Sequence, residues 1–161
     1  MATERDEAHK QLLSALNAAC EVYAMEAQAT SAKYYEKALA RAEASSSDPK
    51  KKFVPFVIMI RRKEPTSTTS LSIEILWARR FPMKQEGRIR LITSAIAKGK
   101  HNHYSRRSIG SGPAWFEELF PEYEPRLTAL RSLIKANRQA RQTLNKNHRA
   151  NSYYSVNSLI Q

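Results

Sequence analysis

The chain has 161 residues, which is enough for one compact domain or for a small domain that carries long helices. Its lysines and arginines (27) outnumber its aspartates and glutamates (15), so the formal net charge is +12 and the isoelectric point lies near 10.0. This charge predicts a polyanionic partner, most simply a nucleic acid, and it says nothing about the fold. The single cysteine, Cys20, excludes an internal disulfide and a cysteine-ligated zinc site, and we expect it to be buried.

The charge is unevenly distributed, and no segment is predicted to enter a membrane. Residues 1–50 carry six basic and eight acidic residues, whereas residues 51–161 carry twenty-one and seven. The N-terminal residues lack the apolar core of a signal peptide, and the longest apolar run, residues 53–60, is too short to span a bilayer. We therefore predict a cytoplasmic protein with no membrane partner, which binds its anion through the residues after position 50.

Residues 1–45 are predicted to be helical. Thr3 and Asp6 have the spacing of a capping box, apolar side chains recur every three or four residues from Leu12, and no glycine or proline occurs before residue 49. One helix of about 40 residues would be ~60 Å long. A break near Thr30 into two shorter helices fits the pattern equally well. Because a small domain could not cover the whole stripe of a single long helix, such a helix would form a homodimer or recruit a partner.

A three-stranded antiparallel meander is predicted next. The run over residues 53–62 is mostly β-branched or aromatic, and Pro55 near its start favours an edge strand. The second strand alternates apolar and polar side chains from Leu71 and is expected to end at Pro82. The third strand is predicted over residues 88–96.

Two helices are predicted in the C-terminal part of the chain. A short helix over residues 114–120 is separated by Pro121 and Pro125 from a last helix over residues 126–146. The remaining residues, 147–161, are rich in asparagine, serine and tyrosine and contain no acid, so we predict that they are disordered. The predicted fold class is therefore α+β, with a small sheet covered by helices.

A dense group of basic residues lies between residues 79 and 107, which hold nine lysines and arginines and one acid, Glu86. Such charge binds nucleic acid through counterion release, and nearby serine, asparagine and tyrosine side chains add neutral donors to phosphates. The exposed aromatic residues of a base-stacking, RNA-binding sheet are missing, which favours duplex DNA. On the last helix, Arg131, Lys135 and Arg138 share a face and would extend this surface if the helix packs beside the sheet.

The segment His101-Asn102-His103 has an enzymatic and a binding interpretation. Its histidines are two residues apart, whereas a helical metal-binding pair needs a spacing of four, and no acid occurs between Glu86 and Glu117. A general base would also need a carboxylate placed beside it. We therefore predict no metal, no cofactor and no catalytic residue, and we interpret both histidines as polar loop residues near phosphate.

Three segments of the chain share a pattern with a known family. They are S-L-S-I-E-I-L-W-A-R-R-F, A-I-A-K-G-K-x-x-x-Y, and P-A-W-F-E-E-L-F leading to E-P-R-L-T-A-L-R-S-L-I-K. Together they cover about residues 53–145 and resemble the MobI family, small auxiliary proteins of conjugative transfer in integrative elements and large plasmids. The resemblance implies a bacterial factor without catalytic residues of its own, which acts at the origin of transfer and helps a relaxase to nick and initiate. The matched positions are Trp77, Arg79, Arg80, Phe81, Lys98, Gly99, Lys100, Tyr104 and Trp115.

The sequence therefore predicts a sequence-selective, double-stranded DNA-binding accessory protein of the relaxosome, with duplex DNA and a relaxase or other transfer proteins as partners. Its DNA-binding domain would cover residues 50–146. An RNA-binding regulator, or a small nuclease using His101 or His103, remains an alternative. The residues expected to contact DNA are Arg79, Arg80, Arg88, Arg90, Lys98, Lys100, His101, His103, Tyr104, Arg106, Arg107, Arg131, Lys135 and Arg138.

Overall fold

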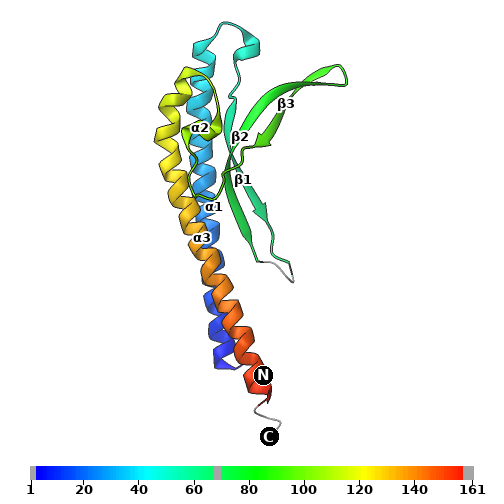
Figure 1. Cartoon of the computed structure of the whole chain (residues 1–161), viewed down its shortest axis with the longest axis vertical. Coiled ribbons are helices and arrows are strands. Elements are labelled where there is room, and N and C mark those ends of the chain that lie inside the picture. Colours follow the sequence, from blue (N-terminus) through cyan, green and yellow to red (C-terminus); the bar gives the residue numbers. More distant parts are fainter. Residues whose placement is uncertain (1–2, 67–69, 158–161) are drawn as a thin grey trace.

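The structure is a computed structural model that describes residues 3–66 and 70–157, with side chains as far as residue 150. It has the predicted α+β fold, in which two long helices run side by side and a three-stranded antiparallel sheet of order β1-β2-β3 lies against part of their length (Figure 1). The elements are α1 (Glu4–Ser45), a short 3-10 helix η1 (Pro49–Lys51), β1 (Phe56–Lys63), β2 (Ser72–Gln85), β3 (Arg88–Ala95), α2 (Arg106–Ile109) and α3 (Ala114–Asn157).

Helix α1 is a single helix of 42 residues, so the unbroken alternative is confirmed. The predicted capping box is present, because the Asp6 amide donates to Thr3 Oγ1 (3.3 Å) and the Thr3 amide donates to Asp6 Oδ2 (3.0 Å). The bond from the Thr3 amide, then the hydrogen bond with His148 and the bond from the Thr3 hydroxyl, stabilise the Asp6 carboxylate and hold its pKa below the usual range. Thr30 lies within the unbroken helix, where its buried hydroxyl is satisfied by donating to the carbonyl oxygen of Glu26 (2.8 Å).

The part of α1 from Cys20 to Ala42 is packed inside the chain against the sheet and α3, whereas we expected from the sequence that a single long helix would cover its apolar stripe with a second copy or a partner. Leu12, at the start of that stripe, is exposed. The packed part of α1 shares one hydrophobic core with the sheet and α3, and its mostly small side chains allow the two long helices to approach closely. Cys20 is fully buried, as predicted. The buried residues of α1 are Cys20, Ala24, Ala27, Thr30, Tyr34, Ala38 and Ala42.

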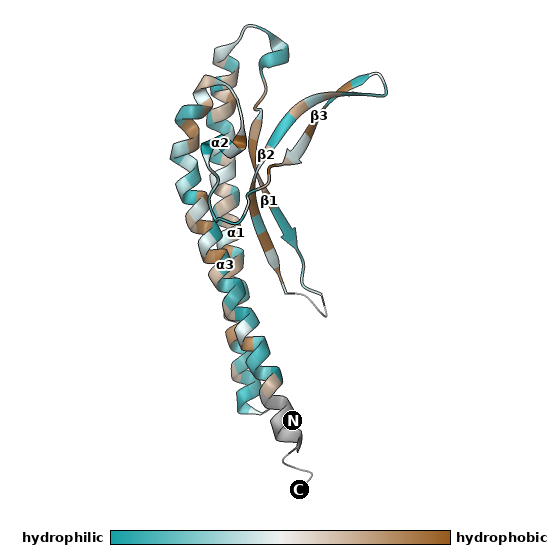
Figure 2. Ribbon diagram, in the orientation of Figure 1, coloured by the Kyte–Doolittle hydropathy of each residue, from teal (hydrophilic) through white to brown (hydrophobic). Residues whose placement is uncertain are grey.

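Trp77 lies at the centre of the core. Its ring is fully buried and makes edge contacts with the rings of Tyr34 (5.1 Å between centroids) and Phe116 (5.5 Å). The alternation predicted for β2 is confirmed over its first half, where Ile73 and Ile75 are also buried on the face toward the helices. Figure 2 shows hydrophobic colour concentrated where the strands and helices meet.

Strand β2 does not end at Pro82, and this prediction is wrong. Its first half pairs with β1 and its second half with β3, and only Ala78 and Arg79 pair with both. The Arg80 amide points to the β1 side, where it donates to the Pro55 carbonyl (2.7 Å). Two residues on, Pro82 faces the same side beyond the end of β1, so its missing N–H costs the ladder no hydrogen bond.

Beyond Arg79 the sheet therefore has two strands, and residues 80–93 form a hairpin that we call the arm. It closes through Glu86 and Gly87, whose φ angles of 50° and 77° are those of a tight two-residue turn that suits the twist of the strands. Figure 1 shows the arm projecting away from the helices.

Helix α3 runs through Pro121 and Pro125 without a break, so the predicted separation into two helices is wrong. Both prolines lie on the exposed side of α3, where a carbonyl that loses its helical partner can be hydrated. The opposite side buries Phe116 and Leu127 in the core, which favours a continuous helix.

Helix α3 also continues through residues 147–157, for which the sequence predicted disorder; residues 158–161 lie outside the described chain. His148 Nε2 lies 2.9 Å from Asp6 Oδ1, and the rings of His148 and His9 stack with centroids 4.0 Å apart. These contacts attach this part of α3 to the first turns of α1, which the pattern of a single segment cannot reveal.

Candidate nucleic-acid interface

The arm presents three cations that lie clear of the core. Every side chain from position 82 to 91 is exposed. Arg88 pairs with Gln85 and Arg90 with Met83, and cross-strand partners share a face, so both arginines lie on one side of the arm. Lys84 lies on the other side and was not a candidate from the sequence, although it falls within the basic stretch.

Arg79 and Arg80 join the base of the arm to the helical body. Arg79 Nη2 donates to the carbonyl oxygen of Ile109 (3.1 Å), and it passes so close to Gly110 that an added Cβ there would lie 2.5 Å from it. Gly110 also has φ = 91°, so two independent features require glycine. Arg80 Nη1 donates to Tyr35 Oη of α1 (3.4 Å). Both arginines therefore orient the arm.

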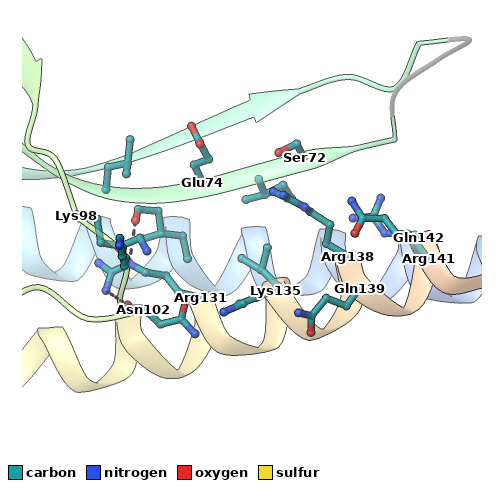
Figure 3. Close-up of a pocket in the computed structure, with 15 residues that line it drawn as sticks. Ser72, Glu74, Lys98, Asn102, Arg131, Lys135, Arg138, Gln139, Arg141 and Gln142 are labelled. Atoms are coloured by element: carbon teal, nitrogen blue, oxygen red, sulfur yellow. Dashed lines mark hydrogen bonds between the residues drawn. The ribbon is translucent and has the colours of Figure 1, made fainter.

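A basic pocket of about 360 Å³ lies between β2, the loop after β3, and α3. Figure 3 shows Lys135 and Arg138 extending from α3 on the side that faces β2, with Lys98 on the loop. The only acid in its lining is Glu74. Its basic lining residues are Lys98, Lys100, Arg131, Lys135, Arg138 and Arg141.

Lys98 is the cation most affected by this environment. Partial burial lowers the pKa of its ammonium group, and the nearby charges of Arg131 and Lys135 lower it further. The ammonium group donates to the carbonyl oxygen of His101, which holds the loop in place. An anion entering the pocket would relieve the repulsion among these cations, so the site is suited to a phosphate group.

Arg131 and Tyr104 are not surface residues, which corrects their prediction as DNA contacts. Arg131 is 6% exposed; its Nη1 donates to Glu124 Oε1 (2.8 Å) and its Nε to the Ile75 carbonyl oxygen (2.8 Å). Glu124 also accepts from Trp77 Nε1 (2.7 Å) and from the Tyr104 amide (2.6 Å). This buried pair holds β2, the loop and α3 together. No periodic pattern in the sequence marks Glu124 as a buried acceptor. Apart from its hydrogen-bond donors on α3, its donors lie 20 or more residues away in the chain.

Arg106 is also engaged within the fold. Its Nη1 donates to the Gly110 carbonyl oxygen (2.6 Å), its Nη2 pairs with Glu117, and its guanidinium carbon lies 4.8 Å from the ring centroid of Phe116. Its neighbour Arg107 is exposed. Of this arginine pair, only Arg107 is presented outward for a phosphate.

The comparison with known families identifies the chain. The model of the MobI protein family matches residues 23–145, which include most of α1, the whole sheet, the arm, the pocket and most of α3. The chain belongs to the MobI family. It is therefore a mobilisation-related protein. No curated protein and no solved structure matches it.

The two histidines of this MobI family member lie on the loop beside the pocket. His101 and His103 are exposed, and their rings stack with centroids 5.1 Å apart. Between them Asn102 anchors the loop to α3, because its Nδ2 donates to Ser132 Oγ (3.2 Å) and its carbonyl oxygen accepts from Arg131. Within residues 3–66 and 70–157, no group of three or more histidine, cysteine, aspartate or glutamate residues could hold a metal ion. None of the helices in those ranges is long and apolar enough to cross a membrane.

Proposed function

We propose that this MobI family member is a sequence-selective, double-stranded DNA-binding accessory protein of the relaxosome. It acts at the origin of transfer and assists the relaxase in initiating conjugative transfer. The observation that carries the proposal is the arm, a projecting two-stranded ribbon with three exposed cations and one acid. Grooves of B-DNA admit a two-stranded ribbon, and the family membership supports a role in mobilisation.

The basic residues divide into two groups with different roles. Arg88 and Arg90 are on the arm, where arginine reaches base edges and phosphates. Lys135 and Arg138 line the pocket with the loop lysines and hold phosphates, which sets the position of the protein on the duplex. The exposed side chains of Lys100, His101, His103 and Arg107 extend this second group.

The proposal places the protein in the bacterial cytoplasm with a relaxase or another transfer protein as its partner. A homodimer through α1 stays a prediction, and the core residues of α1 between Cys20 and Ala42 are covered within the chain by α3 and the sheet. Light scattering of the full chain over a range of concentrations measures the oligomeric state. A monomer at every concentration contradicts the dimer and leaves the DNA-binding proposal unaffected.

Selection of DNA fragments tests the proposed function. Purified full-length protein is mixed with fragmented DNA from cells that carry its mobile element, and bound fragments are sequenced. We expect enrichment of one region that contains the origin of transfer. Arg88→Ala with Arg90→Ala should remove the enrichment, whereas Arg5→Ala with Lys10→Ala, which removes two exposed cations from the first turns of α1 at the other end of the molecule (Figure 1), should not.

Competition decides between the proposal and RNA binding. The enriched duplex should compete for the protein better than RNA of the same sequence. If RNA competes better, or if no region is enriched over bulk DNA, the proposed function is wrong.

The nuclease alternative is tested with His101→Ala and His103→Ala combined. All lysines and arginines remain, so DNA affinity should fall by at most ~1–3 kcal/mol, the value of one or two hydrogen bonds. Neither protein should cut plasmid DNA with Mg²⁺, Mn²⁺ or Zn²⁺. Metal-dependent nicking by the wild type that disappears in the double variant would establish a nuclease instead.

A further inference from the structure

One face of the arm is apolar although it projects from the core. Ile89 is 72% exposed and Leu91 is 42% exposed. Leu91 pairs with Pro82 and Ile89 pairs with Lys84, so three apolar side chains and Lys84 share one face of the ribbon. None of the three belongs to the hydrophobic core. A projecting apolar face of this kind points to a binding surface.

The charge around this face indicates what it binds. The arm carries Lys84, Arg88 and Arg90 against the single acid Glu86, with two more arginines at its base. Two such arms packed through this face would bring the charges of their Lys84 side chains together, which disfavours a second copy as the occupant. Lys84 lies beside Ile89 on this face, and Arg88 and Arg90 extend from the opposite face of the same narrow ribbon. An apolar side chain with cations on both faces around it matches a groove of duplex DNA, where bases lie between two rows of phosphates.

We propose that the arm enters the minor groove of duplex DNA, wedges Ile89 between two base pairs and so bends the DNA. The inference rests on the proposed DNA binding and adds a mechanical activity to it. Minor-groove proteins that bend DNA insert side chains such as isoleucine, leucine or proline between base steps, while arginine and lysine hold the flanking backbone. Ile89 is the most exposed of the large hydrophobic side chains of the described structure.

The geometry of the tip suits insertion. The turn consists of Glu86 and Gly87 alone, so the ribbon stays narrow at its end. Ile89 is the second residue after the turn and points to the apolar face. Residues 80–85 extend the strand by roughly 20 Å beyond Arg79, the last residue that pairs with both neighbouring strands, at about 3.3 Å per residue. Arg79 and Arg80 hold the base of the arm in place through their hydrogen bonds to the Ile109 carbonyl oxygen and to Tyr35 Oη.

Ligase-catalysed circularisation of a short duplex measures the bend. The probe is a duplex of about 120 base pairs that carries the enriched region; it is shorter than the ~150-base-pair persistence length, so it closes slowly unless it is bent. We expect the full-length protein to accelerate closure by about tenfold or more. Ile89→Ala should abolish most of this acceleration, and Ile89→Val should retain it.

Met83 provides the matched control. It is 46% exposed on the same arm but lies on the opposite face, paired with Arg90. Met83→Ala should therefore leave the acceleration intact. If Ile89→Ala and Met83→Ala lose the same amount, or if the wild type binds the probe without accelerating closure, the bending proposal is wrong while the proposed function stands. Failure of the wild type to bind any duplex would instead overturn the proposed function.

Unstacking of bases gives a second, independent readout. 2-Aminopurine placed in turn at each step of the enriched duplex should brighten at one or two steps when the protein binds, and Ile89→Ala should remove the increase. No increase at any step overturns the wedge. A loss of binding to vesicles of anionic lipid in Ile89→Ala, with circularisation unchanged, would assign the apolar face to a membrane surface and would also overturn it.

Discussion

The buried pair of Glu124 and Arg131 is the residue-level feature on which the fold most depends. Glu124→Ala leaves the guanidinium of Arg131 unpaired in the core and removes the acceptor of Trp77 Nε1. We expect the free energy of unfolding, measured with urea, to fall by ~3–5 kcal/mol. The control is Lys37→Ala, which breaks the exposed pair with Glu122 and should cost about 0–1 kcal/mol. Equal losses in the two variants would contradict the structural role of the buried pair.

Lys98 should make DNA affinity depend on pH. Its pKa is lowered in the free protein, so it loses its charge at a lower pH than an ordinary lysine. A phosphate in the pocket favours the charged form, so affinity is full below the lowered pKa and falls as the pH rises through it. Titration of binding between about pH 8 and pH 10 should show a fall that begins below the usual lysine pKa of about 10.4. Lys98→Arg should remove this fall; if it does not, another group titrates.

At the scale of the element, the arm should be separable from the stability of the fold. Replacing residues 82–91 by Asn-Gly joins Phe81 to Ile92, a hydrogen-bonded pair of the kind that closes a two-residue turn, and removes only exposed side chains. The free energy of unfolding should change by less than about 1 kcal/mol. DNA binding should weaken, and the slope of log affinity against log salt should flatten by roughly 2.7, because three cations are lost. An unchanged slope would show that the arm does not meet phosphates.

Strand β2 and helix α3 show why element boundaries were mispredicted. Pro82 was expected to end β2, and Pro121 and Pro125 were expected to separate two helices. The backbone nitrogen of Pro82, however, faces a side of β2 where β1 has already ended, and Pro121 and Pro125 lie on the exposed face of α3. Whether a proline costs a hydrogen bond depends on the neighbours of its backbone, which are set by tertiary structure.

For the whole molecule, α1 should be required for folding, although residues 1–45 looked like a separate segment in the sequence. Removing residues 1–45 deletes all the side chains that α1 contributes to the single hydrophobic core, and it exposes Trp77 and the face of the sheet that packs against the helices. We expect this shortened chain to lose cooperative urea unfolding and the near-ultraviolet circular dichroism of its buried aromatic rings. A chain that starts at Gln11 keeps all core residues of α1 and should unfold cooperatively. Cooperative unfolding of the shorter chain would show an independent domain.

The net charge should dominate the salt dependence of binding. If about five phosphates are neutralised by the arm, the pocket and the loop, log affinity should fall with log salt at a slope near roughly −4.5. Filter binding over a range of salt concentrations measures it. A slope flatter than about −1 would mean that the basic residues do not meet a nucleic-acid backbone.

The sequence by itself determined the fold class, the capping of α1, the buried face of β2 and the basic character of residues 79–107, because these depend on local pattern and composition. Tertiary structure alone decided which of the basic residues of the chain reach the surface. Arg131 and Arg138 are one helical stripe in the sequence, yet Arg131 is buried against Glu124 whereas Arg138 is exposed in the pocket. The physical reason is that a charge is taken out of water only where a partner meets it, and the elements that bring that partner are far apart in the chain.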